Sequence, residues 1–269
     1  MRRSRLGYQW IRNGAPIANA INSNYMLINA DVGKNISVQA RYTDGHGTLE
    51  SLTSAATAAV LSSNGALLFS TAGKDFLTGT SSNNDTVSYA NATATAGVTV
   101  SLAITTQQNT IGAGRDTITD IENLIGSNYN DNLRGNFKTN ILDGGAGNDI
   151  LNGGPEADTL IGGLGDDTFV IDNVNGIVIE NSNEGVDLVR SSASYVLPAN
   201  VENLNLIGTL AINGTGNDLA NIITGNANNN ELIGANGNDT LIGGDGDHTL
   251  DGGAGNDSMQ GGMGVYLYS

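Results

Sequence analysis

The feature that most constrains this chain is a glycine that recurs every nine residues between positions 117 and 170. A period of this length is typical of a solenoid, in which each nine-residue row is one structural repeat. Two other positions of each row also keep their chemistry. The recurring glycines are Gly126, Gly135, Gly144, Gly153 and Gly162. The sixth positions are Glu122, Asp131, Asn140, Asp149, Asp158 and Asp167, and the eighth are Leu124, Leu133, Leu142, Leu151, Leu160 and Phe169.

The clearest rows begin at Gly144 and Gly162 and read G-G-x-G-x-D-x-U-x, where U is apolar. Glycines at the first, second and fourth positions permit positive φ angles, so the first six residues can form a tight turn with inward carbonyl oxygens. Ca²⁺ takes about six to eight oxygen ligands, which such carbonyls and a carboxylate supply. The remaining x-U-x fits a short strand with one inward side chain. The pattern predicts a flattened parallel β-solenoid in which turns two rows apart share an edge.

The aspartates indicate that the metal is required for folding. Stacked rows lie about 4.8 Å apart, and two unit charges at that distance repel by roughly 3 kcal/mol at an effective dielectric constant of about 20. Without a cation the carboxylates oppose the fold, whereas with one they become its ligands. We therefore expect calcium binding and folding to be a single event.

These rows resemble the RTX repeats of hemolysin-type calcium-binding proteins, which Gram-negative bacteria secrete through type I systems. The resemblance covers about residues 73–263 and implies a right-handed parallel β-roll with several Ca²⁺ ions between neighbouring turns of one edge. It also implies a chain that is disordered in the low-calcium cytosol and folds after export, outside the cell. The residues that it assigns to calcium in the first array are Asp131, Gly144, Gly145, Gly147, Asp149, Gly153, Asp158, Gly162, Gly163, Gly165 and Asp167.

A second array repeats the period from Gly216 to Gly261. The tetrapeptide Val201-Glu202-Asn203-Leu204 precedes it, as Ile121-Glu122-Asn123-Leu124 precedes the first, so the chain contains two copies of one larger unit. His248 and Tyr266 occupy sixth positions but offer no carboxylate, and imidazole is a poor ligand for hard Ca²⁺. We expect calcium mainly along one edge of this array. The residues expected to bind it are Gly234, Gly237, Asp239, Gly252, Gly253, Gly255 and Asp257.

The first sixty residues follow a different pattern. Alternating runs at Tyr8–Ile11, Tyr25–Ile28 and Ile36–Tyr42, with turns at Asn13-Gly14 and Asp44-Gly45, predict antiparallel strands. Their order, with Trp10 and Asp31-Val32-Gly33, resembles an immunoglobulin-like module of bacterial surface proteins. Few residues precede Tyr8, so we expect this β-sandwich to lack its first strands.

The sequence thus predicts an all-β chain of five segments. Residues 1–60 form the partial immunoglobulin-like module, and 61–116 form an amino-terminal cap with degenerate rows. Residues 117–170 are the first array, 171–215 a β insertion without the nonapeptide, and 216–269 the second array.

Composition excludes several classes of function. The net charge of −16 argues against binding to nucleic acid or to anionic membranes. There are no cysteines for disulfides or thiolate metal sites, and no apolar run that could insert into a membrane. The sequence holds no H-E-x-x-H, no G-x-S-x-G and no P-loop. We therefore predict a chain that is not an enzyme.

The predicted function is a calcium-binding segment for folding, secretion or presentation within a larger type I secreted or adhesive protein. Its expected partners are calcium ions, the type I secretion machinery and a surface or glycan target. One alternative is the tail of a secreted protease, lipase or mannuronan epimerase whose catalytic domain lies elsewhere. Another is a glycan- or ice-binding adhesin segment. Ice binding favours a ladder of outward threonines, which the positions after the sixth do not form: Asn132, Ile141, Ile150, Thr159 and Thr168.

Overall fold

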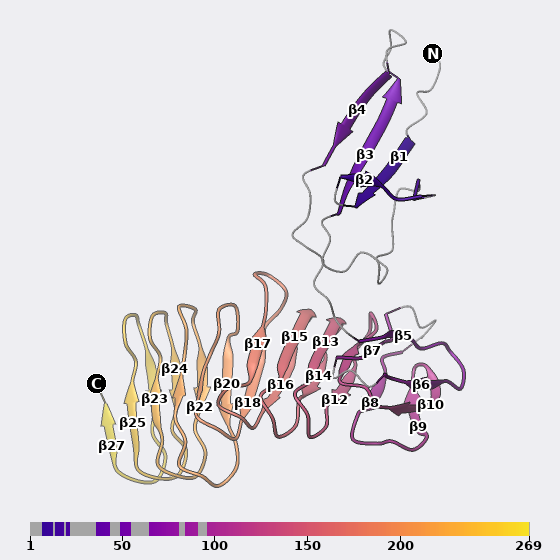
Figure 1. Ribbon diagram of the computed structural model, residues 1–269. Coiled ribbons are helices and arrows are strands. Elements are labelled where there is room, and N and C mark those ends of the chain that lie inside the picture. Colours follow the sequence, from indigo (N-terminus) through magenta and orange to yellow (C-terminus); the bar gives the residue numbers. More distant parts are fainter. Residues whose placement is uncertain are drawn as a thin grey trace. The chain divides into compact units, whose positions relative to one another are not determined.

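The computed structural model describes residues 7–12, 14–18, 20–21, 36–43, 49–54, 65–80, 84–90 and 96–268. Every regular element among them is a β-strand, as predicted, and none is a helix that could cross a membrane. The chain divides into two compact units, Met1–Asn64 and Gly65–Ser269, which Figure 1 shows in indigo and in magenta to yellow.

The first unit is a four-stranded antiparallel sheet with the order β2-β1-β3-β4. Strand β1 (Gly7–Arg12) pairs with β2 (Ala15–Pro16) across a turn at Gly14, which has a φ of +80°. Along its other side β1 pairs with β3 (Ile36–Thr43), and β3 pairs with β4 (Leu49–Thr53).

Strands β1 and β3 lie where the alternating sequence patterns predict them. The predicted strand Tyr25–Ile28 and the turn at Asp44-Gly45 lie outside the described residues. The immunoglobulin-like assignment of this unit stays a prediction.

The second unit is a parallel β-solenoid. One face is a continuous sheet of nine strands, and the other face consists of a six-stranded and a five-stranded sheet (Figure 1). From β11 onward, consecutive strands alternate between the two faces, so two strands make one coil. The nine-stranded face contains β8 (Thr99–Ser101), β12 (Asn132–Arg134), β14 (Ile150–Asn152), β16 (Thr168–Ile171), β18 (Leu188–Ser191), β20 (Asn203–Leu206), β22 (Ile222–Thr224), β24 (Thr240–Ile242) and β26 (Ser258–Gln260).

The opposite face is interrupted once. Its six-stranded sheet contains β5 (Leu67–Phe69), β7 (Thr86–Ser88), β11 (Asn123–Ile125), β13 (Ile141–Ala146), β15 (Thr159–Leu164) and β17 (Ile177–Ile179). Its five-stranded sheet contains β19 (Tyr195–Val196), β21 (Gly214–Thr215), β23 (Glu231–Ile233), β25 (His248–Asp251) and β27 (Tyr266–Tyr268). Strands β17 and β19 share no ladder, whereas β16, β18 and β20 pair continuously on the nine-stranded face. Residues 171–215 therefore continue the coils although they lack the nonapeptide.

The apolar eighth positions form the core of the solenoid. Leu142 is in register with Leu124 and Leu160 on one face, and Leu151 with Leu133 and Phe169 on the other. All six side chains are completely buried. In the second array Ile223, Leu232, Leu241 and Leu250 occupy the same place and are also completely buried. The two-row coil predicted from the sequence is confirmed.

A small additional sheet lies at the start of the solenoid, with the order β6-β10-β9. Strand β10 (Gly114–Thr119) pairs in parallel with β6 (Phe76–Thr78) and antiparallel with β9 (Gln108–Ile111). The segment before the first array thus combines strands of this sheet with β5, β7 and β8 of the two solenoid faces.

Candidate metal centre

Carboxylates from alternate rows stack along one edge of the solenoid, at the turns that lead onto the nine-stranded face. The backbone N–H of Asp131 donates to Oδ1 of Asp149 over 2.7 Å, and that of Asp149 donates to Oδ1 of Asp167 over 2.7 Å. Asp187 accepts from Asp167 in the same way over 2.8 Å. We call this edge the carboxylate edge. Its members are Asp131, Asp149, Asp167, Glu180, Asp187, Glu202, Asn221, Asp239 and Asp257.

Several of these carboxylates have a buried oxygen without a partner. Oδ2 of Asp149, Asp167 and Asp239 and both carboxylate oxygens of Glu180 are buried without a hydrogen bond of normal geometry. In the described part of the chain these are all the buried side-chain oxygens and nitrogens that lack a partner. A buried polar atom without a partner is costly, so the concentration of these oxygens on one edge suits a cation site.

Glycine keeps space open beside these oxygens. A Cβ atom on Gly144 would collide with Oδ2 of Asp149, and one on Gly162 with Oδ2 of Asp167. Gly145 and Gly147 adopt φ angles of +98° and +119°, which residues with a side chain rarely adopt. In the second array Gly234 and Gly252 have the same relation to Asp239 and Asp257. The first position of the row therefore requires glycine, because the carboxylate of the same row fills the space that a side chain would take. The donor atoms around this space are oxygens only, as Ca²⁺ prefers.

Burial is the main reason that these acids are reluctant to ionise. Together with a smaller contribution from neighbouring carboxylates, burial raises the pKa of Asp149 and of Asp167 from 3.8 to about 7. It raises the pKa of Asp187 to about 6 and that of Glu180 from 4.5 to about 8. The backbone amides that donate to Asp149 and Asp167 lower the pKa and offset only part of this effect. A divalent cation would supply the missing counter-charge.

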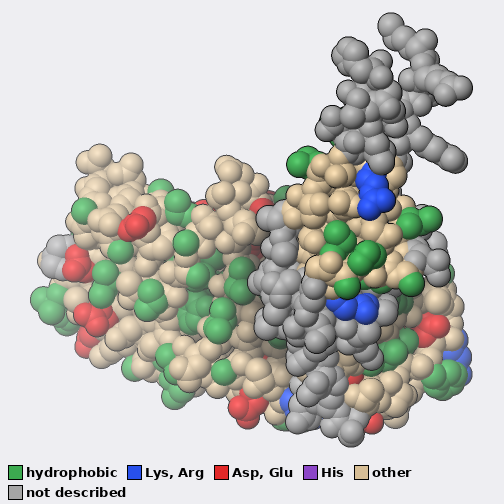
Figure 2. All heavy atoms as spheres, turned by 45° about the horizontal axis from the view of Figure 1, so that its top comes forward, with side chains coloured by type: hydrophobic (Ala, Val, Ile, Leu, Met, Phe, Trp, Pro, Cys, Tyr) green, Lys and Arg blue, Asp and Glu red, His purple; other side chains and the backbone are tan. Residues whose placement is uncertain are grey.

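The charge of the interior is strongly one-sided. Of the 27 acidic residues in the chain, ten have buried side chains in the described part, where no Lys or Arg is buried. On the face that Figure 2 shows, acidic side chains form only small separate patches among uncharged and hydrophobic ones. Much of the negative charge of the solenoid is therefore internal, where solvent ions screen it least.

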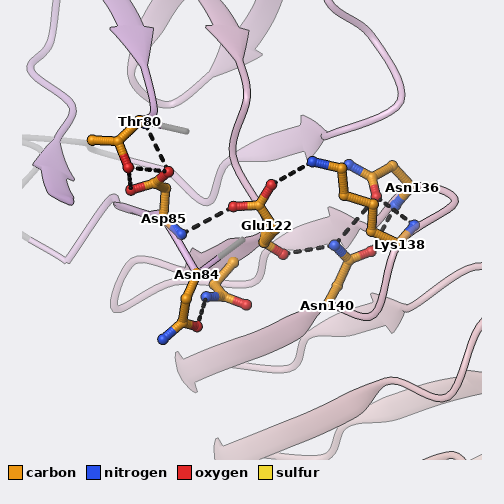
Figure 3. Close-up of polar contacts among 8 residues, drawn as sticks. Thr80, Asn84, Asp85, Glu122, Asn136, Lys138 and Asn140 are labelled. Carbon is orange, nitrogen blue, oxygen red and sulfur yellow. Dashed lines mark hydrogen bonds and ion pairs between the residues drawn. The ribbon is translucent and has the colours of Figure 1, made fainter. Parts of the chain in front are cut away.

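The opposite edge of the first array carries its own counter-charge. Nζ of Lys138 lies 2.6 Å from Oε1 of Glu122, whose other oxygen accepts the backbone N–H of Asp85 over 3.0 Å (Figure 3). Nδ2 of Asn140 donates to the carbonyl oxygen of Glu122 over 2.6 Å. The Lys138 ammonium and the Asn140 amide thus supply the positive charge and the N–H donor that carboxylates lack.

Asp158 and Gly153, which were predicted as calcium residues, also lie on this opposite edge. Oδ1 of Asp158 accepts the backbone N–H of Asn140 over 2.8 Å, and burial raises the pKa of Asp158 to about 6. The neighbouring sixth position is the neutral Asn140, so Asp158 has no second carboxylate from the row before it on this edge. Its site is weaker in anionic ligands than those of Asp149 and Asp167.

In the second array the opposite edge is aromatic. His248 is buried, its Nδ1 accepts the backbone N–H of Asn230 over 3.1 Å, and Nε2 lies 2.9 Å from the carbonyl oxygen of Asp245. These partners assign the proton to Nε2, because Nδ1 faces a donor and Nε2 an acceptor. The ring of Tyr266 stacks on His248 at 5.9 Å, and its hydroxyl donates to the carbonyl oxygen of Gly244 over 3.0 Å. His248 thus binds the preceding coil through a ring nitrogen as an aspartate does through Oδ1, whereas the Tyr266 hydroxyl binds a carbonyl oxygen.

Sequence reasoning missed Glu180, Asp187 and Lys138. Asp187 follows Asp167 by 20 residues, whereas Asp167 follows Asp149 by 18. The extra residues hide the register of this coil. Glu180 stands 18 residues after Gly162, at the first position of a row. Projection of the two-row period beyond the array finds its position but not its role, because the repeat has a glycine there.

Four segments of the chain, which overlap in two pairs, match the family of the RTX calcium-binding nonapeptide repeat: residues 125–160, 134–169, 215–250 and 233–265. They contain Asp131, Asp149, Asp167, Asp239 and Asp257 but not Glu180 or Asp187. No curated protein matches the chain. Such repeats bind Ca²⁺ as a structural module rather than a catalytic one, and they typically occur in secreted proteins. Together with the β-roll and its carboxylate edge, these matches show that both arrays of the chain contain RTX calcium-binding nonapeptide repeats.

Proposed function

We propose that this chain is a calcium-triggered folding segment of a larger secreted or adhesive protein and has no catalytic activity of its own. The larger protein would leave the cell through a type I machinery, and the folded segment would then present its neighbouring parts to a surface or glycan target. The absence of H-E-x-x-H, G-x-S-x-G and P-loop motifs from the sequence agrees with a structural role.

The carboxylate edge carries this proposal. Asp149 and Asp167 each use Oδ1 to bind the preceding coil and leave Oδ2 buried beside a glycine. The coil and the metal site are therefore made by the same side chain. In calcium-poor cytosol the unscreened charges disfavour the coil, whereas calcium outside the cell satisfies them and favours it.

Far-UV circular dichroism during a calcium titration tests the proposal. In chelator we expect residues beyond about 61 to be largely disordered, and millimolar calcium should produce a β spectrum. Equimolar magnesium should not, because Mg²⁺ demands a small, regular octahedral site. A β spectrum of the same strength in chelator would refute calcium-triggered folding.

A further inference from the structure

A three-carboxylate cluster lies where the first array meets the coils that lead to the second. Asp167, Glu180 and Asp187 each place a carboxylate oxygen within 4.8 Å of the others, and all three side chains are buried. Glu180 is only 7% exposed, and neither of its oxygens has a hydrogen bond of normal geometry. Asp167 adds a further unpartnered oxygen, Oδ2.

Glu180 enters this cluster because it replaces a glycine. It stands 18 residues after Gly162, at a row position that holds Gly144 and Gly162 on the same edge of the preceding coils. At those glycines a Cβ atom would collide with the next carboxylate. The side chain of Glu180 instead extends into the site, where a Cβ on Gly162 would also meet its Oε1.

The cluster is held from both sides. The backbone N–H of Asp167 donates to Oδ1 of Asp187 over 2.8 Å, and that of Asp187 donates to Oε2 of Glu202 over 2.8 Å. Nδ2 of Asn200 donates to the carbonyl oxygen of Glu180 over 3.0 Å. These bonds fix the coil that carries Glu180 between the last row of the first array and the segment before the second.

Among the residues that the structure describes, no Lys or Arg forms an ion pair with Asp167, Glu180 or Asp187. The cluster can give three to six carboxylate oxygens, and the glycine-rich turn from Gly162 to Gly165 lies against it. Such a donor set suits a hard divalent cation that takes many oxygens in an irregular arrangement.

We propose that Asp167, Glu180 and Asp187 form a three-carboxylate calcium site that joins the first array to the coils before the second. It differs from a site between two nonapeptide rows, which has two sixth-position carboxylates, because Glu180 adds a third from the first position of its row. The added charge makes it the tightest site of the chain and the first to fill. This inference rests on the proposed calcium-triggered folding.

The test uses the whole chain with Glu180→Gln and Glu180→Gly, and with Glu231→Gln as a matched control on an exposed strand residue. Native mass spectrometry counts calcium ions per molecule, and calcium titration gives the midpoint of folding. We expect both Glu180 variants to lose one ion and to need more calcium to fold, while Glu231→Gln matches the wild type. Glu180→Gly restores the glycine of the row, so its coil remains compatible with the fold.

Stability separates a ligand from a merely structural residue. Removal of a buried charge should raise the urea midpoint of any calcium-free folded state and lower that of the calcium-bound state, whereas loss of packing would lower both. Unchanged ion count and calcium midpoint in both Glu180 variants, or equal losses of stability with and without calcium, would overturn the three-carboxylate site. Either result would leave calcium-triggered folding intact. A wild-type chain that does not respond to calcium would instead refute the proposed function.

Discussion

The backbone N–H of Asp149 donates a 2.7 Å hydrogen bond to Oδ1 of Asp167, two rows further along the chain. Oδ2 of Asp167 is buried and has no partner. One carboxylate therefore serves two tasks, since its first oxygen holds the preceding coil and its second faces the candidate cation site. Substitutions that separate the two tasks can test this division.

The two edges of the first array should differ in their demand for calcium. Asp149 lies between Asp131 and Asp167 on the carboxylate edge, so its side chain borders two candidate sites, whereas Asp158 follows the neutral Asn140. Asp149→Ala should raise the calcium midpoint of folding roughly tenfold more than Asp158→Ala, or by about 1.4 kcal/mol. Calcium titrations followed by circular dichroism measure both midpoints. Equal midpoints, or a larger shift for Asp158→Ala, would contradict the assignment of edges.

Acid should partly replace calcium. Burial raises the folded-state pKa of Asp149 and Asp167 to about 7 and that of Glu180 to about 8, well above their ordinary values. The metal-free folded state therefore binds more protons than the unfolded chain between about pH 4 and pH 8, and its stability falls as the pH rises through this window. In calcium the same carboxylates bind metal when ionised, so calcium should stabilise the fold more at the alkaline end.

Urea denaturation across this pH range, in chelator and in excess calcium, checks the sign. The stabilisation by calcium, measured as the difference between the two midpoints, should grow from the acidic to the alkaline end. A difference that is independent of pH would show that these carboxylates do not change their protonation when calcium binds.

Lys138 should act as a built-in cation for the opposite edge. Its ammonium lies 2.6 Å from Oε1 of the buried Glu122, and this contact raises the pKa of Lys138. Lys138→Ala should lower the stability of the folded chain by roughly 1 kcal/mol, a modest value because the lysine side chain is half exposed. Lys138→Arg should retain most of the stability because it keeps the charge. The calcium midpoint of folding should shift by no more than this loss of stability explains, and the number of bound calcium ions should stay the same. Loss of a calcium ion would contradict the prediction.

Much of this arrangement follows from the period of the sequence. The nine-residue spacing predicts that Leu142 and Leu151 are buried on opposite faces. Each row is a turn followed by a short strand with one inward side chain, so successive strands lie on alternate faces. The spacing also predicts that Asp131, Asp149 and Asp167 share an edge, because two rows make one coil. These are relations that repetition alone determines.

What the period could not predict lies where it is broken. Glu180 occupies a glycine position, and its coil is two residues longer, so no motif marks it. Lys138 occupies a variable row position, and only the folded coil brings it to Glu122, 16 residues earlier. His248 departs from the consensus in sequence, yet its ring nitrogen makes the same backbone hydrogen bond as an aspartate. Each of these depends on a side chain that reaches across coils, which a linear pattern does not encode.

The last prediction is that the opposite edge of the carboxy-terminal coils binds no calcium of its own in the folded chain and can be converted to bind it. Nδ1 of His248 accepts the N–H of Asn230, and the stacked Tyr266 binds the Gly244 carbonyl, so neutral groups fill the positions of two carboxylates. His248→Asp keeps an acceptor for Asn230 but places a charge in a buried position. Any calcium-free folded state of the variant should therefore be less stable than that of the wild type.

Calcium should reverse this loss, because the turn from Gly243 to Gly246 already has the glycines of a calcium row, with φ angles of +88° at Gly244 and +118° at Gly246. The double variant His248→Asp with Tyr266→Asp, which recreates two sixth-position carboxylates on one edge, should gain one calcium ion in native mass spectrometry. His248→Asn serves as the control, since it offers an acceptor without the charge and should gain none. A wild-type chain with an ordered calcium ion in the His248 row would show that the backbone turn alone suffices for binding and that the sixth-position carboxylate does not decide which rows are occupied.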